Sequence, residues 1–85
     1  MVQTSNTLIL ASCLDANFAT ITPVGRTVVL WNSQGSNQSA TITIIGMASR
    51  AAYLDGTLVT SANSGGNLTV SVSFTANQVR SLRIL

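Results

Sequence analysis

Apolar and polar residues alternate along several short segments of this chain, in the pattern of half-buried β-strands. The clearest alternation spans residues 68–74 and places four apolar residues on one face: Leu68, Val70, Val72 and Phe74. Serine and threonine occupy the positions between them. Because successive side chains of a strand point to opposite faces, this segment predicts a strand with one face in a core and the other in solvent.

Two more strand-like segments flank a polar loop in the middle of the chain. Residues 27–31 are β-branched or bulky throughout, and residues 41–45 alternate threonine with isoleucine. Between them, residues 32–39 are asparagine, serine, glutamine and glycine, which bond their own backbone or accept positive φ. We predict that residues 27–46 form a β-hairpin and that the rest of the chain is organised around it.

Shorter segments extend the same pattern. Residues 7–12, 18–22 and 79–85 are candidate strands. Asp55-Gly56 is a strong turn dipeptide, so Tyr53-Leu54 and residues 57–60 are expected to form a small hairpin across it.

The remaining segments are polar or rich in turn residues. Residues 1–6 are expected to form a flexible N-terminal arm or a short edge strand. The composition of residues 61–67, SANSGGN, predicts a flexible loop. Residues 47–54 hold good helix formers and are long enough for one helical turn.

Seven or eight short strands at intervals of about 8–12 residues, with no long helix, are typical of an all-β domain. The length of 85 residues fits one domain, covering residues 1–85. We therefore predict a small single-domain antiparallel β-sandwich, jelly-roll-like in shape, or a barrel. The pattern leaves the strand order open.

A chain of this size needs support beyond its core, because it buries only roughly 60–65% of the surface exposed by its unfolded form. Cys13 is the only cysteine, so no disulfide can form within the chain. There is no histidine, and the only acidic residues are Asp15 and Asp55, so a metal cage is not expected. Oligomerisation is the support that remains, and we predict a homodimer or homotrimer.

Charged residues are unusually rare. They make up 7% of the chain, against roughly a quarter in typical soluble domains. Without lysine, and with only one proline, the sheet edges lack their usual protection, so we expect another subunit or a partner to cover them. A net charge of +2 is too small for a nucleic-acid surface. No window approaches the ~18 apolar residues of a membrane span, so neither nucleic acid nor a membrane is an expected partner.

The chain also lacks the residues on which most catalytic mechanisms depend. General acid–base catalysis usually uses histidine or two close carboxylates, whereas Asp15 and Asp55 lie far apart in the sequence, each beside turn residues. No histidine is present to activate Cys13 or a serine hydroxyl. We predict that the protein is not an enzyme and binds no cofactor.

Four residues are candidates for a binding interface: Trp31, Tyr53, Arg80 and Arg83. Trp31 ends an apolar strand, where core packing is the simpler interpretation and an interface anchor is the alternative. Tyr53 lies near a turn, and both roles are open for it. Arg80 and Arg83 are three positions apart on a strand, so they point to opposite faces and at least one reaches solvent or a partner.

Two sequence patterns carry a resemblance to a known family. Residues 28–44 read as strand–Asn–polar loop–TxTI, and residues 69–82 read as TVxV–turn–xVRSL. In this arrangement the chain resembles the small β-sandwich decoration, or cement, proteins of tailed phages. The family usually has a glycine in the turn before the last strand, whereas this chain has Ala76-Asn77. Asparagine can also adopt the positive φ needed there.

The resemblance implies a virion structural protein on the capsid exterior, which binds the major capsid protein and stabilises the shell through subunit contacts. Such proteins often sit as trimers or dimers around a symmetry axis. Two other functions remain open. One is a phage tail, baseplate or fibre module that binds glycans through Trp31 or Tyr53. The other is a bacterial surface or pilus-like subunit, completed by strand addition.

Overall fold

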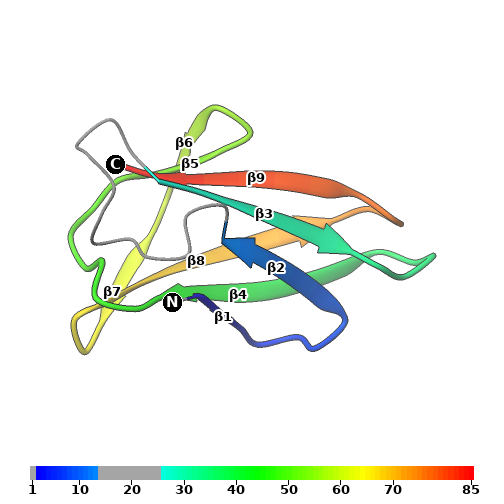
Figure 1. Cartoon of the computed structure of the whole chain (residues 1–85), viewed down its shortest axis with the longest axis horizontal. Coiled ribbons are helices and arrows are strands. Elements are labelled where there is room, and N and C mark those ends of the chain that lie inside the picture. Colours follow the sequence, from blue (N-terminus) through cyan, green and yellow to red (C-terminus); the bar gives the residue numbers. More distant parts are fainter. Residues whose placement is uncertain (1, 14–25) are drawn as a thin grey trace.

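The computed structural model describes residues 2–13 and 26–85, and within them the chain forms nine strands and no helix. The strands are β1 (Val2–Thr4), β2 (Ile9–Cys13), β3 (Arg26–Asn32), β4 (Gln38–Ile44), β5 (Ala52–Leu54), β6 (Thr57–Val59), β7 (Ala62–Ser64), β8 (Asn67–Phe74) and β9 (Val79–Ile84). They build a four-stranded sheet, β1-β4-β8-β7, and a five-stranded sheet, β2-β3-β9-β5-β6 (Figure 1). All pairings are antiparallel, and the predicted β-sandwich is confirmed.

One core fills the space between the two sheets. Its buried apolar side chains come from both inner faces: Ile9, Val28, Leu30, Ala40, Ile42, Ile44, Met47, Ala52, Leu54, Leu68, Val70, Val72, Phe74, Leu82 and Ile84. In β8 the four apolar residues are buried, while Ser71 and Ser73 are exposed. The predicted alternation of this strand is therefore confirmed.

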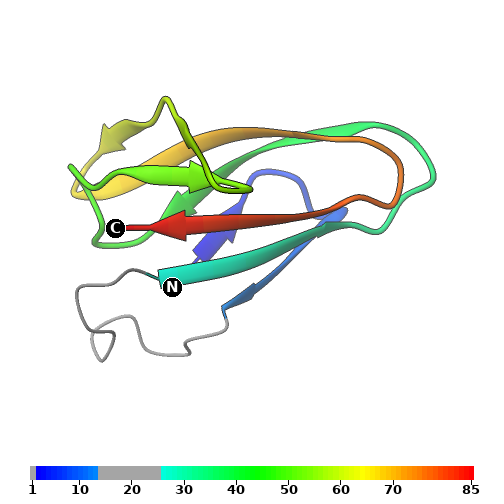
Figure 2. The ribbon, with the colours of Figure 1, turned by 90° about the horizontal axis from the view of Figure 1, so that it is seen from above.

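The two strands that flank the central polar loop do not form the predicted hairpin. β3 lies in the five-stranded sheet between β2 and β9, whereas β4 lies in the four-stranded sheet between β1 and β8. The chain crosses from one sheet to the other after Asn32, as the views in Figures 1 and 2 show. The prediction is wrong because alternation identifies the buried face of a strand but not its neighbour. Here the two apolar faces pack against each other across the core.

Asn32 fixes this crossing from inside the fold. Its side chain is fully buried, and Nδ2 donates to the carbonyl oxygens of Ser36 (2.8 Å) and Thr75 (2.9 Å). Its Oδ1 accepts the backbone N–H of Gln34 at 3.0 Å. Thr75 belongs to the connection between β8 and β9, which also crosses between the sheets. One buried amide therefore ties two of the sheet crossings together, those after β3 and after β8.

The two tight hairpins lie elsewhere in the chain. β5 and β6 pair across Asp55 and Gly56, whose φ angles are 50° and 86°, so the hairpin predicted there is confirmed. β7 and β8 pair across Gly65 and Gly66, both at positive φ. The prediction of a plain loop at residues 61–67 is therefore wrong, because the two glycines permit a tight turn that brings a short strand onto β8.

Three other local predictions are settled by the structure. Residues 1–6 include the edge strand β1, which pairs with β4. Residues 47–54 contain no helical turn, because Ala52 and Leu54 are buried and the strand they belong to pairs with β9. The strand count exceeds the seven or eight predicted, since β7 was expected as a loop and β1 as either an arm or a short edge strand. The strand predicted at residues 18–22 lies outside the described residues.

Candidate interaction surface

The outer faces of the two sheets have different chemistry. The outer face of the four-stranded sheet carries short polar side chains: Gln3, Ser39, Thr41, Thr43, Thr69, Ser71 and Ser73. Several exposed apolar side chains instead lie on the outer face of the five-stranded sheet. Since a hydroxyl face is readily hydrated and an apolar one is not, the five-stranded sheet carries the candidate interaction surface.

Three of these apolar side chains form a row across adjacent strands. Leu10 on β2 is opposite Trp31 on β3, and Trp31 is opposite Val79 on β9. Their exposed fractions are 48%, 42% and 60%. Directly opposed residues on one sheet face lie in contact range, so these three side chains form a contiguous patch, here called the apolar row.

The place of Trp31 corrects the simpler of its two interpretations. Alternation along β3 sends Val28, Leu30 and Asn32 into the core. Trp31 therefore points outward, and the core interpretation is wrong. Its role as an interface anchor remains a proposal.

A second row crosses the same outer face nearer the C-terminal end of β9. Thr27, Arg83, Tyr53 and Leu58 are opposed in register from β3 to β6. Tyr53 is half-buried, and Arg83 and Leu58 are exposed. Three of the four predicted candidates thus share one sheet face: Trp31, Tyr53 and Arg83.

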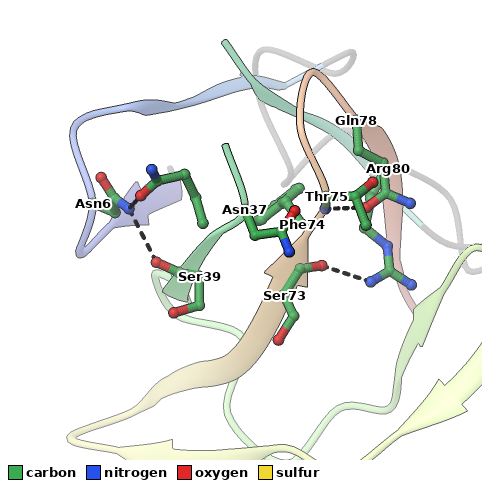
Figure 3. Close-up of a pocket in the computed structure, with 9 residues that line it drawn as sticks. Asn6, Asn37, Ser39, Ser73, Phe74, Thr75, Gln78 and Arg80 are labelled. Atoms are coloured by element: carbon green, nitrogen blue, oxygen red, sulfur yellow. Dashed lines mark hydrogen bonds between the residues drawn. The ribbon is translucent and has the colours of Figure 1, made fainter. Parts of the chain in front are cut away.

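Arg80 lies elsewhere, on the inward side of β9 at the flank of the sandwich. Its Nη1 donates to the Ser73 carbonyl oxygen of β8 at 2.8 Å (Figure 3). Its Nε donates to Asp55 Oδ2 at 2.8 Å. Asp55 also bonds the backbone of Ser81, with Oδ1 accepting its N–H and the Asp55 N–H donating to its carbonyl, both at 2.8 Å. Arg80 therefore links β8 of the four-stranded sheet to the β5–β6 turn of the five-stranded sheet.

These contacts change the acidity of Asp55. The backbone N–H of Ser81 and the guanidinium of Arg80 stabilise the carboxylate, and partial burial opposes them, so the pKa of Asp55 lies below its ordinary 3.8. The ionised Asp55 carboxylate therefore stabilises the folded state fully at pH values above the unfolded-state pKa. This stabilisation is lost as the pH falls through the lower, folded-state pKa.

We therefore expect Asp55→Asn to weaken the dependence of stability on acid. The variant is less stable than the wild type at about pH 6, and the difference is smaller at about pH 2, because this contribution is lost progressively as pH falls towards the lowered folded-state pKa. Urea unfolding at both pH values measures this. A difference that stays constant between them would show that the charge of Asp55 contributes nothing to stability.

A polar hollow lies near the crossings after β3 and β8, with a volume of about 700 Å³. It is lined by Asn6, Asn37, Gln38, Ser39, Ser73, Phe74, Thr75, Gln78 and Arg80 (Figure 3). Several of its polar groups bond one another: Asn6 Nδ2 donates to Gln38 Oε1 at 3.2 Å, and Gln78 Oε1 accepts the Thr75 N–H at 2.9 Å. These contacts brace the loops, and the one aromatic side chain of the lining, Phe74, is buried.

In residues 2–13 and 26–85, no three or more histidine, cysteine, aspartate or glutamate side chains gather as a metal site. The described part of the chain also holds no helix long and apolar enough to span a membrane.

No family model, no curated protein and no solved structure matches this chain.

Sequence reasoning missed Leu10 and Val79, which complete the apolar row with Trp31. Val79 was detectable, because it lies four positions before Arg83 and therefore on the same face of β9. Its position opposite Trp31 depends on the register between β3 and β9, two strands that are distant in the sequence. The apolar row can therefore be identified only when the strand pairing is known.

Proposed function

We propose that this chain is a virion structural protein that binds the exterior of a capsid shell, as the decoration proteins of tailed phages do. The observation that carries this proposal is the apolar row of Leu10, Trp31 and Val79 on an exposed sheet face. Large apolar and aromatic side chains grouped on a surface are typical of protein–protein contacts. The resemblance of residues 28–44 and 69–82 to decoration proteins supports the choice of partner.

The contrast between the two outer faces gives the orientation. The five-stranded sheet faces the major capsid protein or a second copy of the chain, with Trp31 as the central anchor. The hydroxyl-rich face of the four-stranded sheet remains in water. Contacts among copies around a symmetry axis, as a dimer or trimer, supply the stability that a small core lacks.

Trp31→Ser is expected to weaken shell binding about 30-fold, since an interface tryptophan contributes about 2 kcal/mol. The measurement is co-sedimentation with shells assembled from the major capsid protein encoded in the same genome. Ile45→Ser is the matched control, because Ile45 is an exposed apolar residue that lies outside the apolar row. Equal loss in both variants would contradict a specific role for the row.

The oligomeric state is tested separately. Sedimentation of the purified chain across a dilution series is expected to give a dimer or trimer that dissociates on dilution, and Trp31→Ser shifts it towards monomer. A wild-type chain that stays monomeric and also fails to bind shells would overturn the proposal.

A glycan-binding tail or fibre module is the second candidate, because Trp31 presents an aromatic ring to solvent on a sheet face. Stacking of a sugar on this ring would change its fluorescence. Trp31 is the only tryptophan of the chain, so the tryptophan fluorescence during a titration with host cell-surface glycans measures binding at this residue. A saturable change without shell binding would favour this candidate.

A further inference from the structure

The four-stranded sheet has an edge that is only partly paired. β8 runs from Asn67 to Phe74, but β7 accompanies only its first three residues and the pairing ends at Ala62 opposite Thr69. Beyond that point, no further strand lies beside β8 on this side in the described part of the chain. The other side of β8 is paired with β4 as far as Phe74.

Hydrogen bonds of the neighbouring strand β4 show in which direction the backbone N–H and carbonyl groups of β8 point. The Thr41 carbonyl of β4 accepts the Ser5 N–H at 3.0 Å, and the Thr41 N–H donates to Ser5 Oγ at 2.8 Å. Both backbone groups of Thr41 therefore point away from β8. In an antiparallel pair, bonded and non-bonded positions alternate. Thr41 is opposite Ser71, so the backbone groups of Ser71 and Ser73 also point away from β4, towards the partly paired edge.

The contacts of Arg80 agree with this direction. Its Nη1 reaches the Ser73 carbonyl oxygen from the open side. Within residues 2–13 and 26–85, alternation therefore leaves the N–H and carbonyl of Ser71 and the N–H of Ser73 facing a side that has no partner strand. Both residues are exposed. The edge therefore presents two donors and one acceptor in the spacing of a β-ladder.

Space is available in line with β7. A groove of about 360 Å³ adjoins the end of that strand and is lined by Val59, Thr60, Ser61, Ala62, Thr69 and Ser71. An additional strand beside Ser71 would continue the line of β7 past Ala62. It would leave the Arg80 contact to the Ser73 carbonyl in place.

We propose that the open edge of β8 binds an extended segment of a partner polypeptide as an added strand, with an acidic residue opposite Val72. Alternating backbone donors and acceptors are matched best by another extended backbone. Opposed residues share a sheet face, so the residue opposite Val72 points inward, to the flank where Arg80 lies. A carboxylate there can accept hydrogen bonds from the guanidinium. This site is independent of what the apolar row contacts.

The first test is a peptide titration of the isotope-labelled full chain, followed by NMR. The probe is acetyl-Thr-Val-Glu-Val-Thr-amide, and a second peptide with lysine in place of glutamate is the charge control. Three main-chain hydrogen bonds and one ion pair should give a Kd on the order of 1 mM. Shifts are expected at the amides of Ser71 and Ser73, with binding of the lysine peptide about fivefold weaker.

Two variants at Ser73 distinguish the contribution of its backbone N–H to peptide binding from that of its side chain. Ser73→Pro removes the free N–H, and proline is tolerated on a strand edge where that group is unbonded. Ser73→Ala leaves the backbone unchanged. Peptide binding is expected to be lost in the first variant and retained in the second. If Ser73→Pro does not fold, slowed amide exchange at Ser71 and Ser73 of the wild type on peptide addition decides the question.

Several outcomes would overturn the proposal. They are equal binding by the two variants, peptide shifts elsewhere on the chain, or no shifts up to about 5 mM peptide. Protection of Ser71 and Ser73 that rises with protein concentration alone, without peptide, would show that a second copy occupies the edge instead.

Discussion

Asn32→Ala is expected to destabilise the protein by about 3 kcal/mol, because it removes three hydrogen bonds from a buried position. The carbonyls of Ser36 and Thr75 lose their donor, and the Gln34 N–H loses its acceptor. Urea unfolding should show a lower midpoint with an unchanged slope. Asn37→Ala is the matched control, since Asn37 is an exposed asparagine in the same connection, and its effect is expected to be within about 0.5 kcal/mol.

Asn32→Asp distinguishes hydrogen bonding from the loss of volume. Aspartate has nearly the same shape and keeps the acceptor for Gln34, but an ionised carboxylate cannot donate to the two carbonyls. We expect destabilisation at least as large as that of Asn32→Ala, partly relieved at low pH when the side chain is protonated. An aspartate variant as stable as the wild type would show that the buried amide acts only by filling space.

Leu82→Ala is the second change with a large expected effect, at about 3 kcal/mol. Leu82 is fully buried in β9, opposite Val28 on one side and Leu54 on the other, so truncation leaves a cavity at the centre of the five-stranded sheet. For a domain of this size, such a loss is a large part of the total stability. Thermal and urea unfolding measure the effect.

Leu58→Ala is the control for Leu82. Leu58 is also a strand leucine, but its exposed fraction is 61%, so its truncation is expected to cost less than about 0.5 kcal/mol in the monomer. Comparable losses in the two variants would mean that Leu58 is covered by another subunit in solution. That result would point to an interface larger than the apolar row.

The sequence predicted well which side chains of β8 face the core, but it did not predict which strands lie side by side. Period-two alternation in residues 68–74 correctly separated core from surface. The same rule, applied to β3, requires Trp31 to face outward once Val28 and Leu30 are inside, yet its place in an apolar strand favoured the core interpretation. Position along a strand was the better guide than residue type.

Strand pairing could not be predicted, because it is decided between distant segments. β3 and β4 look like the arms of a hairpin, and only their partners β9 and β8 show that they belong to different sheets. The role of Asn32 depends on the Thr75 carbonyl, which lies far away in the sequence. The Arg80–Asp55 pair likewise joins segments whose proximity depends on β5 lying beside β9. Composition had indicated unprotected edges, and within the described residues β8 has no partner strand beyond Thr69 on the side of β7.

The sheet crossings after β3 and after β8 also govern when the protein can fold. Each crossing separates strands that follow one another in the chain, so the interior partners of β3 and β4 are the late strands β9 and β8. During synthesis, Val28 and Leu30 remain without their neighbours on β9 until residues 79–84 have been made. The pairings β2–β3 and β1–β4 and the small hairpins at Asp55-Gly56 and Gly65-Gly66 can form earlier. The five-stranded sheet is complete only after β9 has been made, so the sandwich assembles in a slow step dominated by long-range pairing.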